Sequence, residues 1–96
     1  MDTRSKVQEL LKALGSPVRL RIILALDELR EATLYKLSSW TGVKRTLLRK
    51  HLETLVSCGV CVRKVHGDVL LYSLNLDDER VGRFVDALRE LLLRTP

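Results

Sequence analysis

The stretch from Thr41 to Cys58, TGVKRTLLRKHLETLVSC, constrains the fold of this chain more than any other. Apolar residues recur in it at the spacing that one buried face of an α-helix requires: Val43, Leu48, Leu52, Leu55 and Val56. The other face carries cations and no acid before Glu53: Lys44, Arg45, Arg49 and Lys50. Gly59 follows and suits the left-handed position that ends a helix. The stretch therefore predicts an amphipathic helix with a basic N-terminal half.

A shorter segment of the same periodicity lies upstream, with Leu34, Leu37 and Trp40 on one face and Thr33 as its N-cap. A turn at Thr41-Gly42 separates it from the basic helix. Two helices joined by a short turn that contains glycine are typical of a helix-turn-helix, here over residues 34–58. Its second helix, residues 44–57, is then expected to enter the major groove of DNA.

The positive charge of the chain is concentrated around this motif. Residues 36–66 hold seven lysines and arginines and one acid, a local net charge of +6, while the whole chain has +5. Such clustering suits the binding of a polyanion. A merely solvated helix face is the alternative, and the coincidence of motif and charge favours DNA.

Two more helices are predicted before the motif. The first covers residues 3–14 and ends at Gly15. Ser16-Pro17 then supplies an N-cap hydroxyl and a proline at the first helical position, which opens a helix that runs to about Leu29. Residues 30–32 form either a short strand or a link.

After Gly59 the pattern changes to two strands, residues 60–66 and 69–75, joined by a turn at Gly67-Asp68. A hairpin directly after such a helix is the wing of a winged helix. A last helix follows over residues 76–94, with Asn75 or Asp77 as its cap. We therefore predict one mostly α domain with a β-hairpin wing (α+β), in the order α-α-(short β)-α-α-β-β-α.

The last helix carries a continuous apolar stripe, and the first helix has one of its own. A terminal helix with so much apolar surface favours pairing with a second chain. The terminal helices, residues 1–15 and 76–94, are therefore predicted to form a homodimer interface. Its expected residues are Val7, Leu10, Leu11, Val81, Phe84, Val85, Leu88 and Leu92.

Two stretches carry a family resemblance. LKALGSPVRLRIILAL, residues 11–26, resembles the opening of ArsR-type winged-helix repressors. TGVKRTLLRKHLETLVSCGVCVRKVHGDVLLYSL is similar to the same family from recognition helix to wing, with Arg-Lys-His-Leu in place of the family's Ser-Arg-His-Leu. The resemblance extends over roughly residues 7–92. It implies a homodimeric, DNA-binding transcriptional regulator that dimerises through its first and last helices.

The chain departs from the metal-sensing members of that family. Its third helix reads LYKLSSW, without cysteine or histidine, and its last helix has no histidine. No metal site and no cofactor are therefore expected. Lys44 stands where the family usually has a serine cap, and a lysine cannot accept a backbone N–H. Its extra charge points to phosphate contact.

The predicted DNA contacts come from the basic helix and from the wing, residues 62–70. Arginine can bind guanine bidentately, whereas lysine more often meets phosphate as a point charge. His51 is either structural or a phosphate contact, and Leu47 either touches a thymine methyl or is buried. The predicted DNA-binding residues are Lys44, Arg45, Thr46, Arg49, Lys50, Arg63, Lys64 and His66.

Cys58 and Cys61 form a Cys-x-x-Cys, which invites a zinc or redox interpretation. A zinc site normally needs four ligands, and the chain has only two histidines. Core packing is therefore favoured for both cysteines. It is also the expected role of Trp40 and Tyr72.

No secretory signal, membrane-length apolar run or enzymatic constellation is present in the sequence. We expect a cytoplasmic, nucleoid-associated regulator, not an enzyme. It would bind double-stranded DNA sequence-specifically as a homodimer and repress or modulate transcription; the sequence identifies neither an inducer nor the sign of regulation. The alternatives are a chromatin-type protein of low specificity and a winged helix used only for protein–protein assembly.

Overall fold

The computed structural model describes residues 4, 8, 11 and 14–93. Its elements, in chain order, are α2 (Pro17–Leu29), β1 (Glu31–Ala32), α3 (Leu34–Thr41), α4 (Arg45–Ser57), β2 (Cys61–His66), β3 (Val69–Leu74) and α5 (Glu79–Leu93). This is the winged helix-turn-helix predicted from the sequence, and residues 30–32 do contribute a short strand. Most of the first predicted helix, with Val7 and Leu10, lies outside the described residues.

Local chemistry sets the helix ends. The Ser16 hydroxyl accepts from the Arg19 N–H at 3.4 Å, and the Thr33 hydroxyl accepts from the Lys36 N–H at 3.0 Å, so both predicted caps are confirmed. Gly59 takes φ +79° just after α4, as expected.

The predicted cap of the last helix is wrong. The Asp78 carboxylate accepts from the Arg80 N–H at 3.0 Å and caps α5. Asn75 is engaged elsewhere, since its side-chain amide donates to the Gly59 carbonyl at 2.9 Å. Asn75 thus ties the end of the hairpin to the end of α4.

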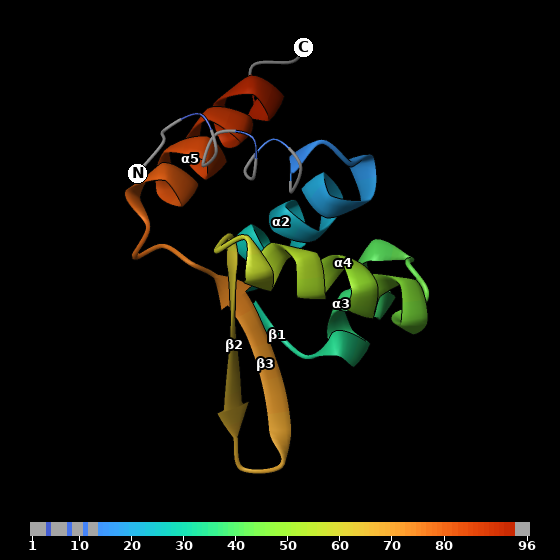
Figure 1. Cartoon of the computed structure of the whole chain (residues 1–96). Helices are drawn as coiled ribbons and strands as arrows, with labels where there is room; N and C mark the ends of the chain where they lie inside the picture. The colour runs from blue at the N-terminus through green and yellow to red at the C-terminus, as the bar shows by residue number, and fades with distance from the viewer. Residues whose placement is uncertain (1–3, 5–7, 9–10, 12–13, 94–96) are drawn as a thin grey trace.

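The three strands form an antiparallel sheet in the order β1-β3-β2. Pairing of His66 with Val69 leaves a two-residue turn in which Gly67 takes φ +64°. Figure 1 shows the β2–β3 hairpin extending well beyond the helices, with β1 beside its base only. The hairpin is therefore a wing with an exposed distal half.

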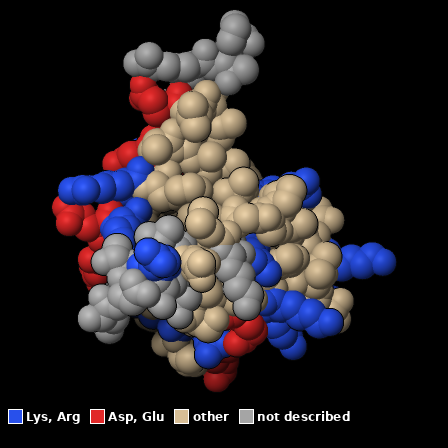
Figure 2. Space-filling model, turned by 45° about the horizontal axis from the view of Figure 1, so that its top comes forward, with Lys and Arg blue, Asp and Glu red and all other residues tan. Residues whose placement is uncertain are grey.

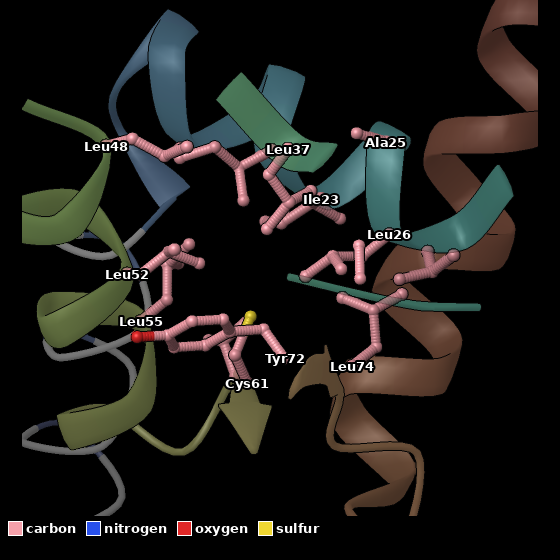
Figure 3. Close-up of a cluster of buried hydrophobic side chains, with 14 of the residues drawn as sticks. Ile23, Ala25, Leu26, Leu37, Leu48, Leu52, Leu55, Cys61, Tyr72 and Leu74 are labelled. Atoms are coloured by element: carbon pink, nitrogen blue, oxygen red, sulfur yellow. The ribbon is translucent and has the colours of Figure 1, made fainter. Parts of the chain in front are cut away.

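The core lies between α2, α4 and the sheet (Figure 3). Tyr72 is buried in it, as predicted, but Trp40 is 52% exposed and that prediction is wrong. The inward positions of α3 are Leu37 and Thr41, and this leaves Trp40 at the rim. The fully buried side chains include Ile22, Ile23, Leu26, Leu37, Leu48, Leu52, Leu55 and Val60.

The apolar stripe of α5 divides between two roles. Val81 and Val85, both expected at a dimer interface, are each only 3% exposed and belong to the core of the chain itself. They face inward because α5 packs on α2. Phe84 and Leu88 are partly buried, while the last part of the stripe is exposed, with Leu92 at 50%.

Within the described ranges, each helix is too short or too polar to cross a bilayer.

Candidate nucleic-acid interface

The amphipathic pattern of α4 positions its cations. Leu48, Leu52 and Leu55 are fully buried, and this fixes the rotation of the helix about its axis. The opposite face is therefore held toward solvent. Its exposed residues are Arg45, Thr46, Leu47, Arg49 and Lys50, so Leu47 is not buried.

A small polar network fixes the turn between α3 and α4. The buried Thr41 hydroxyl donates to the Leu37 carbonyl at 2.6 Å and accepts from the Val43 N–H at 3.2 Å. The Ser38 hydroxyl donates to the Val43 carbonyl at 2.7 Å. Gly42 takes φ +75°, a conformation that suits glycine. The angle at which α4 leaves the turn is thus set by specific bonds.

Lys44 is the N-cap residue of α4 and provides no side-chain cap, as predicted. Its side chain is exposed at the positive end of the helix. Four cations therefore stand within seven residues, without an acid among them: Lys44, Arg45, Arg49 and Lys50. An anion placed here meets both the side chains and the helix dipole.

An open groove of about 550 Å³ runs between α3, α4 and the wing. It brings together three predicted contact residues, Arg45, Thr46 and Arg49, of which the two arginines lie one helical turn apart. The acid at the wing tip, Asp68, lines the same groove. The complete lining is Thr33, Leu34, Tyr35, Arg45, Thr46, Arg49, Asp68, Val69 and Leu70.

Tyr35 is a site residue that the sequence reasoning missed. It is 71% exposed, and the Arg45 guanidinium carbon lies 5.6 Å from the centroid of its ring. This is a cation–π distance, so the ring restricts where Arg45 points. An exposed aromatic residue in the first turn of the predicted third helix was the available signal.

The wing separates its cations between two faces. Neighbouring residues of a strand point to opposite faces, so Arg63 and Lys64 diverge. Arg63 pairs across the hairpin with the buried Tyr72 and lies on the face turned toward α4. Its Nη1 donates to Glu53 Oε1 at 2.7 Å. Lys64 and His66 are exposed on the other face.

His51 has a structural role rather than an exposed one. The Arg19 Nε–H donates to His51 Nδ1 at 3.1 Å, which joins α2 to α4. Burial, and then the charge of Arg19, lower the pKa of His51 below its ordinary value. The neutral imidazole is the form that accepts this bond.

Cys61 packs in the core, as expected, and Cys58 is partly buried against it. Burial raises the pKa of the Cys61 thiol to about 12, so thiolate chemistry is disfavoured there. In the part of the chain that the structure describes, no group of three or more His, Cys, Asp and Glu side chains could hold a metal ion.

Lysine and arginine are unevenly distributed over the face of the molecule that Figure 2 shows. Figure 2 shows lysine and arginine side chains projecting from the side where α3 and α4 lie in Figure 1. On the opposite side acidic and basic side chains are interspersed, and α5 contains ion pairs such as Arg83–Glu79 at 3.1 Å. The positive charges of α5 are therefore partly neutralised by acidic residues of the same helix.

Comparison with known proteins agrees with this geometry. A family model described as bacterial regulatory protein, arsR family, matches residues 16–61. HlyU from Vibrio cholerae is 26% identical and superposes with a TM-score of 0.82, covering 98% of this chain and 100% of that one. The transcriptional repressor BigR from Xylella fastidiosa is 26% identical with a TM-score of 0.78, covering 92% and 87%.

The homodimeric winged helix-turn-helix DNA-binding domain of a possible ArsR-family regulator from Mycobacterium bovis shares the fold. It is 24% identical with a TM-score of 0.79, covering 92% of this chain and 79% of that one. A sequence comparison with curated proteins gives no match.

Proposed function

This chain belongs to the ArsR-type winged helix-turn-helix regulators, and we infer that it binds specific sites in duplex DNA as a homodimer and represses transcription. The family and the structural neighbours are transcriptional regulators rather than enzymes. Its place of action would be the nucleoid, in the cytoplasm.

The observation that supports this function best is the exposed basic face of α4 beside an open groove. Arg45 and Arg49 line that groove from one side of the helix. A major groove about 12 Å wide admits an α-helix, and arginine can bind the guanine edge there bidentately. Lys44 and Lys50 would meet the flanking phosphates, and Thr46 would lie between the arginines.

The wing would extend this contact along the duplex. Lys64 and His66 are exposed on the hairpin face opposite Arg63 and would reach the backbone or the minor groove. Neither is committed to an ion pair within the described residues. Their contribution would be sequence-independent, since phosphates carry no base information.

A homodimer would form through the terminal helices. The M. bovis domain with this fold is described as homodimeric, and the exposed end of α5 gives a second chain an apolar surface. Since Val81 and Val85 are occupied by the core, we assign the contact to Phe84, Leu88 and Leu92, together with Leu11, which is 64% exposed. Two-fold symmetry would place half-sites about one helical turn apart, or a multiple of it.

The test compares Arg49→Ala with Lys64→Ala on a site selected from genomic fragments. Arg49→Ala should cost about 1–3 kcal/mol at that site and relax the preference at one base pair. Lys64→Ala should weaken all duplexes about equally and lower the salt slope by roughly one. Arg83→Ala is the matched control, because it also removes one exposed charge but lies on α5 in a pair with Glu79.

Competition distinguishes the alternatives. Random duplex that competes as well as the selected site would indicate low-specificity coating of DNA instead. Absence of any duplex binding at low salt would reject the proposed function and favour protein–protein assembly.

A further inference from the structure

We propose that Glu53 and Arg63 form a clamp that sets the position of the wing relative to the recognition helix, so that Arg63 is a positioning residue and not a phosphate ligand. The proposal rests on the proposed function, because the helix and the wing are its two DNA-contacting parts. It assigns a role to Glu53, the one acid among residues 36–66.

Backbone bonds fix the base of the wing: one joins it to α4, and one joins the two ends of the hairpin to each other. The Val60 N–H donates to the Leu55 carbonyl at 2.9 Å, and the Asn75 N–H donates to the Val60 carbonyl at 2.9 Å. The Asn75 amide bond to Gly59 adds a third link. These links hold the first residues of β2 but leave the direction of the distal hairpin to other contacts.

The next attachment along β2 is the ion pair, level with the buried Tyr72 of β3. Arg63 lies two residues beyond the start of β2 and reaches back across ten residues of sequence to Glu53 at 2.7 Å. Beyond it, residues 64–70 are all exposed. A restraint at Arg63 therefore limits the directions that the distal part of the hairpin, with His66 and the turn, can take.

The orientation of the strand makes the pair specific. Arg63 shares its hairpin face with Tyr72, which is buried in the core, so this face is held against the body of the protein. The guanidinium cannot turn to the outer face, where Lys64 lies, without giving up the Glu53 bond. The outer face is thus left for phosphate contact while the inner face is anchored.

The pair also changes the charge of the contacting surface. Glu53 is the single acid among seven cations between residues 36 and 66, and alone it would repel a DNA backbone. At 2.7 Å the guanidinium neutralises it locally. The Glu53 side chain is 57% exposed and that of Arg63 is 40% exposed. An exposed pair of this kind contributes only about 0–1 kcal/mol to the free energy of unfolding. Its main effect is therefore on the wing and not on stability.

The experiment uses three variants of the full chain on one selected duplex: Arg63→Gln, Glu53→Gln and the charge swap E53R/R63E. Glu53→Gln adds a unit of positive charge, so simple attraction to DNA would tighten binding. Loss of the clamp should instead weaken it about twofold, and Arg63→Gln should weaken it about fivefold. The swap keeps the net charge and can re-form the pair, so binding should return to within about threefold of wild type.

A phosphate-ligand role for Arg63 predicts a different pattern. Glu53→Gln would then bind as tightly as wild type or more tightly, the swap would bind worst, and Arg63→Gln would lower the salt slope by roughly one. That result would overturn the proposal while leaving the proposed function intact. Wild-type protein that binds no duplex would reject both.

A measurement without DNA tests the restraint itself. In free Arg63→Gln and Glu53→Gln, backbone ¹⁵N order parameters of residues 62–71 should fall relative to wild type, with those of α4 unchanged. Unaltered wing order in both variants would contradict the clamp even if DNA affinity changed.

Discussion

Thr41→Val tests the turn that joins α3 to the recognition helix. Valine matches threonine in shape but cannot make the bonds of the Thr41 hydroxyl to Leu37 and Val43, at 2.6 and 3.2 Å. One lost hydrogen bond costs about 1 kcal/mol, and a buried N–H left without its acceptor costs about 1–3 kcal/mol. The added methyl group recovers at most about 0.8 kcal/mol. We expect a net loss of about 2 kcal/mol in the free energy of unfolding.

Urea denaturation at fixed protein concentration measures this loss, since the stability of a dimer depends on concentration. Trp40, the only tryptophan, adjoins Thr41 and reports the transition by fluorescence. Thr54→Val is the matched control, because it removes a hydroxyl that donates to the Lys50 carbonyl at 3.3 Å in an exposed position. It should cost less than about 0.5 kcal/mol. A Thr41→Val protein as stable as this control would refute the role given to the turn network.

Three further predictions concern other parts of the molecule. The pKa of His51 is lowered in the folded state, so the unfolded chain binds the proton more readily. The free energy of unfolding should therefore fall as pH drops through about 6.5. In denaturation experiments at controlled pH, His51→Gln should reduce this dependence, because its amide oxygen can still accept from Arg19. Native-state alkylation mapped by mass spectrometry should modify Cys58 well before Cys61, whose thiol pKa is about 12. Equal rates of alkylation would contradict the burial of Cys61 in the core. Leu88→Glu should give monomer or aggregate in sedimentation, and a wild type that sediments as a monomer would refute the proposed interface.

The features that the sequence predicted correctly are those with local causes. The caps at Ser16 and Thr33 and the helix end at Gly59 depend on residues within one turn. The buried face of α4 follows from periodicity alone. Such signals survive in the folded chain because tertiary packing agrees with them.

The sequence is least informative where distant residues compete for one position. Trp40 was expected in the core from its size, but Thr41 takes the inward place with a satisfied hydroxyl. Val81 and Val85 carry the same apolar signal as Leu92, yet in the fold they are buried within the chain, where α5 packs on α2, while Leu92 is exposed. A hydrophobic stripe gives the buried face of a helix, and it does not say whether one chain or two bury it.

The same limit applies to charge. A count along residues 36–66 treats Arg49 and Arg63 alike, because each adds one unit of charge. In the fold Arg49 faces an open groove, whereas Arg63 is held 2.7 Å from Glu53. Exposed charges are screened within about 8 Å at physiological salt, so the local arrangement, and not the total, determines what a phosphate meets. Under the proposed function, the cations that meet DNA would therefore be concentrated on α4, and the wing would contribute through Lys64, His66 and the direction in which the hairpin is held.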